Sequence, residues 1–154
     1  MTEEPEHSPR RLKVAQFTDN YGPGSNGLMF AVQQLEGNLL DAGHEVVVVA
    51  PKAKGPNPHL GREGRIEVRL PSVRVPNMPT RVANGRHFER TIEQVGHLDP
   101  DVIHVHGLGT VGVLGTWAAK RLNKPMLMTW HTDFDAYADH YAAVLPLLHG
   151  VVRA

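Results

Sequence analysis

The stretch HEVVVVAP, residues 44–51, decides the fold class of this chain. It is a continuous β-branched run closed by a proline, and such runs are typical of strands buried on both faces of a parallel sheet. The preceding segment carries apolar residues at helical spacing, at Leu28, Val32, Leu35 and Leu39. Gly43 can end that helix, and residues 12–18, LKVAQFT, form a strand ahead of it. Residues 12–51 are therefore predicted to fold as a right-handed strand, helix and strand unit.

The rest of the chain continues this alternation of strands and helices. Three more strands are predicted, at residues 65–71, 99–107 and 125–130. Two more helices show apolar stripes, at Phe88, Ile92 and Val95 and at Val111, Leu114, Ala118 and Leu122. A last helix is expected from Tyr137 to at least Pro146, whereas residues 72–80, SVRVPNMPT, are broken by two prolines. The pattern predicts an α/β fold, a Rossmann-like three-layer sandwich with a mainly parallel sheet of about five strands.

The composition limits the kinds of protein that this chain can be. Its 154 residues and 41% apolar content suit one domain with a normal core. The 16 basic and 16 acidic residues cancel, so no nucleic acid is expected as a partner. The absence of cysteine from the sequence excludes disulfides and thiolate metal sites and suits a reducing compartment. No apolar run reaches the ~18 residues of a membrane span, and we expect a cytoplasmic protein.

Three polar loops are the candidate binding segments. They follow the predicted strands and read TDNYGPGSNG at 18–27, HVHGLGT at 104–110 and WHTDFDAY at 130–137. In parallel α/β sheets, ligands bind beyond the carboxyl ends of the strands, where the strand order reverses. The topology therefore predicts that these three segments meet on one rim of the sheet.

The first of these loops is rich in glycine and opens onto a helix. Gly22, Gly24 and Gly27 match the G-x-G-x-x-G pattern, and backbone N–H groups at a helix N-terminus suit a phosphate or diphosphate. The alternative is a flexible turn in which Ser25 or Asn26 caps the helix. The strand that follows ends without an acidic residue to hold a ribose, which disfavours a nicotinamide-dependent enzyme.

Histidines and acids occupy the other two loops. His104 and His106 share one face of a strand and could chelate a metal, but no third ligand is evident. His104 suits a partly buried polar position, and His106 can line the rim. Asp133 and Asp135 could bind a divalent ion or act as acid and base, and Asp133 could equally cap the next helix. His131 directly follows a strand, where it could face a substrate, and no serine lies in a G-x-S-x-G elbow.

Three arginines lie on or near one predicted helix. Arg81, Arg86 and Arg90 could approach anionic lipid headgroups. Glu89 and Glu93 balance their charge, however, so the three arginines make no basic patch. A solvated helix face is therefore the favoured interpretation.

Four motifs together resemble one enzyme family. They read FTDNYGPGSNG at 17–27, GHEVVVVAP at 43–51, PDVIHVHG at 100–107 and TWHTDFDAY at 129–137. From about residue 12 onward, the chain resembles the N-terminal domain of the retaining glycosyltransferases of family four, which have the two-domain GT-B fold. It is most similar to bacterial members that glycosylate or mannosylate lipids such as phosphatidylinositol or diacylglycerol.

The resemblance implies roles for residues on the rim. Gly27 would offer its backbone N–H to the donor diphosphate, beside Asn26, which stands where many members have glycine. His131 matches the histidine that contacts the transferring sugar near its anomeric centre, so it is the implied catalytic residue. The acceptor side of the cleft would be formed by five residues, Asp19, Asn20, Tyr21, Asp133 and Tyr137.

The resemblance also implies the type of reaction. A UDP- or GDP-sugar would be the co-substrate, a sugar or a lipid would be the acceptor, and neither a metal nor another cofactor is expected. The acceptor would attack on the face from which the diphosphate departs, and the diphosphate would take up the acceptor proton. Such a reaction requires no enzymatic nucleophile, in agreement with the sequence.

The resemblance further predicts which part of the enzyme this chain represents. Residues 1–11 are expected to be a disordered tail, and residues 12–154 the acceptor-side N-terminal domain. The C-terminal domain, which in the family grips the nucleotide and the sugar, is not part of this sequence. We therefore expect the chain to be an excised domain or a natural fragment that is inactive alone. A lipid acceptor would bring it to the inner face of the membrane as a peripheral protein.

Two other functions are also compatible with the sequence. A free-standing Rossmann-like module, binding or regulatory, would pair with a separate chain, and an exposed apolar face that dimerises would favour it. Metal-dependent hydrolysis would use four residues, His104, His106, His131 and Asp133. Tight, stoichiometric zinc binding would support that last alternative.

Overall fold

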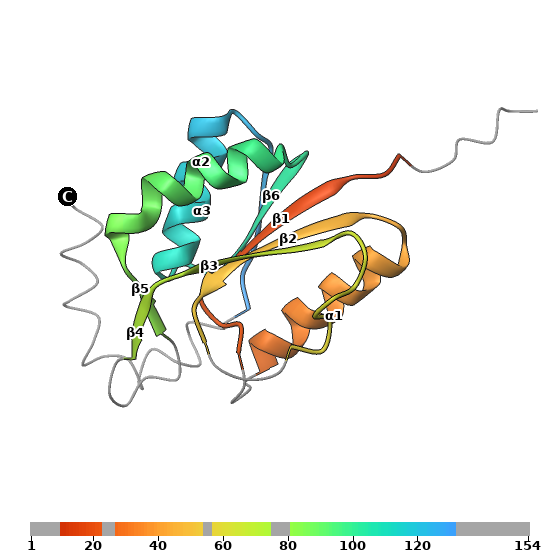
Figure 1. Ribbon diagram of the computed structural model, residues 1–154, viewed down its shortest axis with the longest axis horizontal. Helices are drawn as coiled ribbons and strands as arrows, with labels where there is room; N and C mark the ends of the chain where they lie inside the picture. Colours follow the sequence, from red (N-terminus) through yellow and green to blue (C-terminus); the bar gives the residue numbers. More distant parts are fainter. Residues whose placement is uncertain (1–9, 23–26, 54–56, 75–80, 132–154) are drawn as a thin grey trace, which may run out of the picture.

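The computed structural model describes residues 10–22, 27–53, 57–74 and 81–131 (Figure 1). The strands in these ranges are β1 (Lys13–Thr18), β2 (Glu45–Pro51), β3 (Arg65–Leu70), β4 (Ser72–Arg74), β5 (Arg81–Ala83), β6 (Val102–His106) and β7 (Met126–Thr129). The helices are α1 (Gly27–Asp41), α2 (Phe88–Leu98) and α3 (Thr110–Leu122), with a 3-10 turn, η1 (Gly85–His87), directly before α2. Most of the predicted tail and the whole of the predicted last helix lie outside the described residues.

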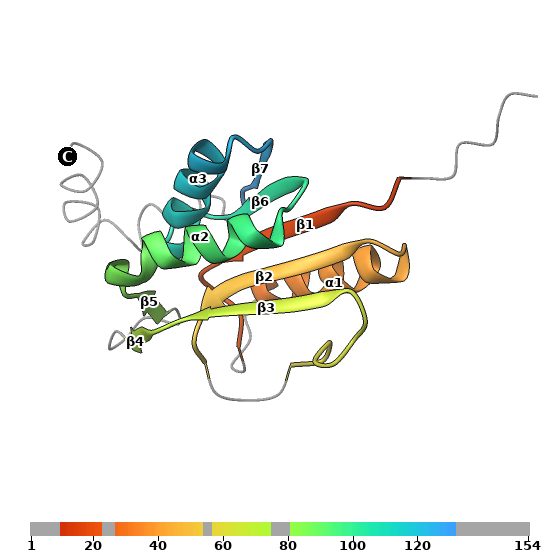
Figure 2. The same ribbon diagram turned by 45° about the horizontal axis from the view of Figure 1, so that its top comes forward.

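Five strands form one parallel sheet in the order β3-β2-β1-β6-β7 (Figure 2). This confirms the predicted α/β class and the predicted parallel sheet. The strand order reverses between β1 and β6, which are neighbours in the sheet although α1, β2 and α2 lie between them in sequence. Residues 72–83 differ from the sequence interpretation, because β4 and β5 pair antiparallel on either side of the two prolines. In the sequence, both prolines fall between these two short strands.

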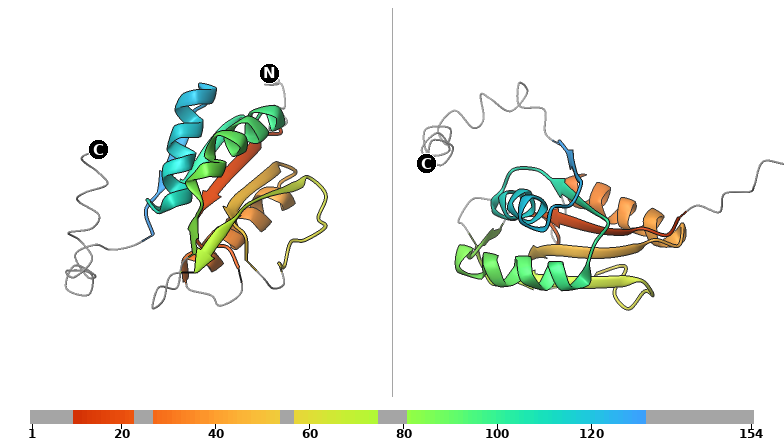
Figure 3. Two further views of the ribbon diagram at one scale, coloured as in Figure 1. Left: turned by 60° about the vertical axis from the view of Figure 1, so that its left-hand side comes forward. Right: turned by 90° about the horizontal axis from the view of Figure 1, so that it is seen from above.

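Helices cover both faces of the sheet, as a three-layer sandwich requires (Figures 1 and 3). The core under α2 and α3 contains Val47 and Val49 of β2, and the core under α1 contains Val46 and Val48 of the same strand. Successive side chains of a strand point to opposite faces, so the unbroken valine run supplies both cores. The uniform run HEVVVVAP is thus explained by a central strand that is buried on each side.

The helix α1 follows its predicted apolar stripe only in part. Val32 is buried and Leu39 is partly buried, but Glu36 is also completely buried. The helix ends at Asp41, and Gly43 follows with a φ of 81°. Glycine adopts this left-handed conformation without a steric penalty, which confirms the predicted helix end.

The helix α3 lies unusually close to the sheet at two glycines. A Cβ at Gly112 would stand 2.0 Å from the carbonyl oxygen of Gly107, and a Cβ at Gly115 would stand 2.8 Å from Phe17 and from Val105. Any side chain at either position would push the helix away from β1 and β6. The two glycines therefore set how closely the first turn of α3 approaches the end of β6.

Candidate active site

The candidate site lies where β1, β6 and β7 end. Thr18 of β1 is in register with His106 of β6, and His106 is in register with Thr129 of β7. The residues that follow these strands therefore meet at one edge, at the point where the strand order reverses. The structure describes five of the predicted site residues there or at the start of α1: Asp19, Asn20, Tyr21, Gly27 and His131. The other three, Asn26, Asp133 and Tyr137, lie outside the described residues.

Three histidines form a row at this edge. The Nδ1 atom of His106 is 3.0 Å from the Nε2 atom of His131, and the two rings stack with their centroids 5.3 Å apart. The ring of His104 lies 4.0 Å from that of His106, and its Nε2 atom is 2.7 Å from the Thr129 hydroxyl. His131 is exposed, whereas His106 is 2% exposed. The row thus runs from the protein surface into the sheet, and the expected rim position of His106 is correct only in part.

Burial favours the neutral form of all three imidazoles. It lowers the pKa of His106 to about 3, with further lowering from its two histidine neighbours. Burial and the neighbouring His131 lower the pKa of His104, and burial lowers the pKa of His131. A neutral imidazole has one donor and one acceptor nitrogen. In the neutral form, each ring can therefore donate one hydrogen bond and accept another without carrying a charge.

A metal site would need more ligands than this row offers. Within the ranges that the structure describes, no group of three or more His, Cys, Asp or Glu side chains is arranged to hold a metal ion. The facing nitrogens of His106 and His131 are hydrogen-bonded to each other. Asp133, the fourth ligand in the hydrolase alternative, lies outside the described residues.

Asp19 joins two of the three rim loops. Its carboxylate accepts hydrogen bonds from the Thr110 hydroxyl at 2.9 Å, from the Val111 N–H at 2.8 Å and from the Gly112 N–H at 3.1 Å. It therefore caps the N-terminus of α3 from a distant part of the chain, and a Cβ at Gly109 would stand 2.3 Å from it. Burial raises the pKa of Asp19, although these hydrogen bonds act in the opposite direction.

The side chain of Tyr21 is buried and hydrogen-bonded within the protein. It is 4% exposed, its hydroxyl donates to the buried carboxylate of Glu36, and the Arg69 guanidinium lies 5.0 Å from its ring centroid. Arg65 ion-pairs with Glu36 and approaches the Tyr21 hydroxyl at 3.4 Å. Burial and the hydrogen bond to Glu36 raise the pKa of Tyr21 to about 12. This buried polar cluster fixes the residue that enters the glycine-rich loop. The apolar spacing along the helix does not predict this cluster, although Glu36 beside an apolar helical stripe is an unusual residue that indicates a buried polar contact.

Gly27 and Asn20 occupy more open positions. Gly27 begins α1 and is exposed, and among the described residues outside its own helix turn and chain neighbours no atom lies within 4 Å of the point where a Cβ would stand. Its backbone can therefore be approached closely at a helix N-terminus. Asn20 is half-buried, and its N–H donates to the Thr18 hydroxyl at 3.2 Å.

The three arginines considered above do not form one continuous face. Arg81 lies on β5 and donates to the Ser72 hydroxyl at 2.9 Å and to the Ser72 carbonyl at 3.0 Å. Arg86 and Arg90, in η1 and α2, are exposed. A solvated surface accounts for the last two, and a local structural role accounts for Arg81.

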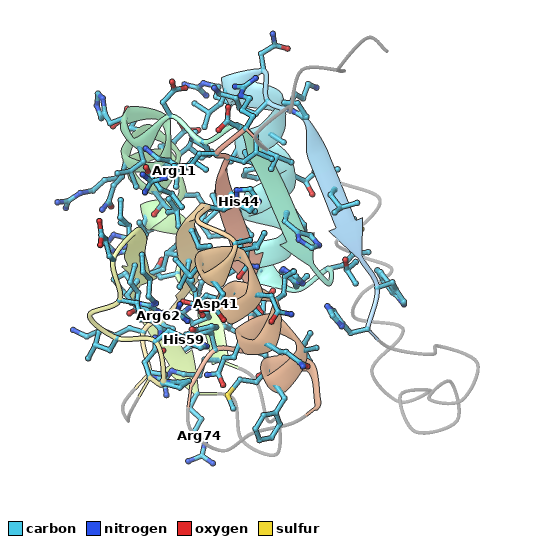
Figure 4. All side chains as sticks on the ribbon, turned by 90° about the vertical axis from the view of Figure 1, so that its right-hand side faces the viewer. Arg11, Asp41, His44, His59, Arg62 and Arg74 are labelled. Carbon is cyan, nitrogen blue, oxygen red and sulfur yellow. The ribbon has the colours of Figure 1, made fainter. Side chains whose placement is uncertain are left out.

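A hollow lies on the outer side of α1, away from the three histidines. It has a volume of about 480 Å³ and is lined in part by Gly37, Asp41, His59 and Arg62. Figure 4 shows Asp41, His59 and Arg62 beside one another there. Arg62 pairs with Asp41, and the His59 Nε2 atom is 2.9 Å from the Gln33 carbonyl oxygen. These side chains attach the segment after β2 to α1. The hollow is therefore a gap in the packing between this segment and the helix.

The fold and the rim together define a class of protein. The described structure is similar to the crystal structure of Acinetobacter baumannii MurG, with a TM-score of 0.55 and 18% identity, over 84% of this chain and 39% of that one. The domain is a Rossmann-like half of the GT-B glycosyltransferase fold. A family model described as Glycosyltransferase Family 4 matches residues 25–153, and the chain belongs to this family.

The relatives include enzymes named for lipid substrates. The chain is 30% identical to an alpha-monoglucosyldiacylglycerol synthase of Streptococcus pneumoniae, over 86% of this chain and 29% of the relative. It is 31% identical to a GDP-mannose-dependent alpha-(1-6)-phosphatidylinositol dimannoside mannosyltransferase of Mycobacterium tuberculosis, over 82% of this chain and 32% of the relative. It is also 30% identical to a GDP-mannose-dependent alpha-mannosyltransferase of Mycolicibacterium smegmatis, over 84% of this chain and 35% of the relative.

The match covers only part of each relative. The chain spans about a third of the length of the curated relatives that it matches.

None of the helices in the described ranges has the length and apolar character needed to cross a membrane.

Proposed function

We propose that this chain is the acceptor-side N-terminal domain of a retaining glycosyltransferase that moves a sugar from a UDP- or GDP-sugar to a lipid acceptor. The observation that carries the proposal is the family match over residues 25–153, combined with an exposed His131 that follows β7 and contacts His106 at the end of β6. The relatives named for diacylglycerol and phosphatidylinositol products support a lipid acceptor. The GDP-mannose-dependent relatives make GDP-mannose the first donor to test.

His131 would act by electrostatic contact with the transferring sugar. Its ring is exposed, burial lowers its pKa and so favours the neutral form, and its Nε2 atom is 3.0 Å from the Nδ1 atom of His106. A developing oxocarbenium ion and a departing diphosphate are stabilised by dipoles that are fixed before the reaction begins. The Gly27 N–H at the start of α1, with Asn26 beside it, would contact the diphosphate from the opposite loop. The diphosphate would accept the acceptor proton, so no metal and no further cofactor would be needed.

The predicted acceptor residues divide into two groups. Asp19 and Tyr21 are held by contacts within the protein, so we assign them to shaping the acceptor side of the cleft. Asn20, which is half-buried between them, is the described residue best placed to contact the acceptor. Asp133 and Tyr137 remain predicted acceptor contacts.

The chain alone would be inactive, because it supplies one wall of a two-domain cleft. In this proposal a C-terminal domain holds the nucleotide, and transfer occurs at the cytoplasmic face of a membrane that supplies the lipid. The proposal predicts weak or undetectable binding of free GDP or UDP to the 154-residue chain.

The test is transfer of radiolabelled sugar from UDP- and GDP-sugars to a membrane lipid extract. The full-length gene product is compared with the 154-residue chain, with full-length His131→Ala and with full-length His97→Ala. His97 is an exposed histidine in the last turn of α2, remote from the rim, and serves as the matched control. We expect activity in the full-length wild type and the control, and a loss of about 100-fold or more in His131→Ala. Full activity of His131→Ala would remove this residue from the chemistry.

A further inference from the structure

The buried histidine behind His131 has an unusual hydrogen-bonding position. The Nδ1 atom of His106 lies 3.0 Å from the Nε2 atom of His131. Its own Nε2 atom is buried and has no hydrogen-bond partner among the described residues. The ring of His106 stacks with that of His131 at a centroid distance of 5.3 Å and lies 4.0 Å from the tilted ring of His104, so these contacts restrict its orientation.

Only two proton arrangements satisfy the contact between the two rings. Both imidazoles are neutral, so one nitrogen of the pair donates and the other accepts. If His131 donated, His106 would carry its own proton on Nε2, and a buried N–H would be left unpaired. If His106 donates from Nδ1, only a lone pair on Nε2 is left unpaired. Buried N–H groups without a partner are rarer in proteins than under-satisfied acceptors, so the second arrangement is favoured.

The second arrangement determines the proton position on His131. Its Nε2 atom accepts from His106, so its single proton resides on Nδ1. We propose that His106 is a positioning residue that fixes His131 in the Nδ1–H form, so that His131 presents a hydrogen-bond donor to the ligand. The chemical partner of that donor is an oxygen acceptor, such as a sugar hydroxyl or a diphosphate oxygen.

This tautomer restricts the role that His131 can have in proton transfer. A ring that is protonated on its free nitrogen cannot take a proton from the acceptor, so His131 is a donor and not a general base. The burial of His106 supports this arrangement, because it disfavours the imidazolium in which both ring nitrogens would donate. The identity of the ligand oxygen rests on the proposed function, but the tautomer of His131 does not.

The direct test is long-range ¹H–¹⁵N NMR on the 154-residue chain labelled with ¹⁵N-histidine, recorded at neutral pH. We expect the Nδ1 of His131 in the shift range of a protonated ring nitrogen and its Nε2 in the range of an unprotonated one. The Nε2–H form of His131, or rapid exchange between both forms, would overturn the proposal. This measurement requires no variant and no activity.

Two matched substitutions test whether His106 is the cause. The side-chain amide of His106→Asn can place an N–H near the position of Nδ1, whereas that of His106→Gln reaches the position of Nε2. We expect the Nδ1–H form of His131 to persist in His106→Asn and to be lost in His106→Gln, with similar backbone spectra in both variants. Persistence of this form in His106→Gln would show that His106 does not fix the tautomer.

The kinetic consequence is measured on the full-length enzyme. His106→Gln is expected to lower kcat by about tenfold while changing the KM for the donor much less, and His106→Asn is expected to restore most of kcat. Equal kcat values for the two variants would contradict the positioning role. Failure of the proposed function is recognised separately, because the full-length wild type would then transfer no sugar to the lipid extract, whatever the tautomer found by NMR.

Discussion

Asp19 shows how one carboxylate can hold two loops of the rim together. Both of its oxygens accept hydrogen bonds from the first turn of α3, and Gly109 leaves the space in which the carboxylate lies. A negative charge at a helix N-terminus is also favoured by the helix dipole. The residue after β1 therefore determines where the loop after β6 lies.

Removal of this carboxylate is predicted to destabilise the domain. Asp19→Ala would leave two N–H groups of α3 without their acceptor, at a cost of about 2 kcal/mol in the free energy of unfolding. The measurement is urea denaturation followed by circular dichroism. Asp41→Ala serves as the control, because that carboxylate is 70% exposed in its pair with Arg62. Equal stability of the two variants would contradict the role assigned to Asp19.

The lowered pKa of the buried His106 should make the stability of the domain depend on pH. Its pKa is about 3 in the folded chain, from an ordinary value of 6.5, so the unfolded chain binds a proton that the folded chain excludes between these limits. Its contribution to stability is complete above pH 6.5 and falls as the pH drops toward 3, by up to about 1.4 kcal/mol per pH unit. In His106→Asn the free energy of unfolding should depend less on pH across this window. The same slope in wild type and variant would show that another group is responsible.

At the scale of elements, a buried polar cluster attaches α1 to β3. Glu36 of α1 is fully buried and pairs with Arg65 of β3, and the Tyr21 hydroxyl completes the contact. Breaking a buried ion pair by removing one partner leaves the other charge without compensation. The cluster therefore fixes the start of the glycine-rich loop relative to the helix that receives it.

The cluster predicts a large difference between two glutamates. Glu36→Ala should lower the free energy of unfolding by about 3–5 kcal/mol, because the buried Arg65 would keep only Glu67 as an ion-pair partner and the Tyr21 hydroxyl would lose its acceptor. Glu89→Ala, in an ion pair with Arg121 whose side chains are 64% and 65% exposed, should change it by about 0–1 kcal/mol. Chemical denaturation of both variants measures the difference. A cost below about 1 kcal/mol for Glu36→Ala would mean that water replaces the missing carboxylate.

At the scale of the whole molecule, the strand β7 forms an apolar edge of the described sheet. Met126, Leu127 and Met128 are 44%, 54% and 37% exposed. Within the described ranges β7 pairs only with β6, so its other edge is available to another segment or chain. Exposed strand edges with apolar side chains promote pairing between chains.

The isolated chain is therefore predicted to self-associate through β7. Light scattering coupled to size exclusion, over a range of concentrations, should show species larger than a monomer, and Met126→Lys should shift the distribution toward the monomer. Val73→Lys, a substitution of a 63% exposed residue on β4, should leave it unchanged. A monomer at every concentration would exclude β7 as an association surface of this chain.

The sequence alone determined the class of fold, because the patterns that indicate it are local. The valine run of β2, the helical stripes and the glycine after α1 each reflect the burial of one short segment. It also indicated which loops follow the strands, and hence that His131 lies near the site. Only the tertiary structure decided what these loops contact. Asp19 meets α3 across 91 residues, and His106 meets His131 across 25, because parallel pairing brings the ends of β1, β6 and β7 to one edge. No local pattern encodes such contacts, since they depend on strand order and register rather than on the spacing of residues along the chain.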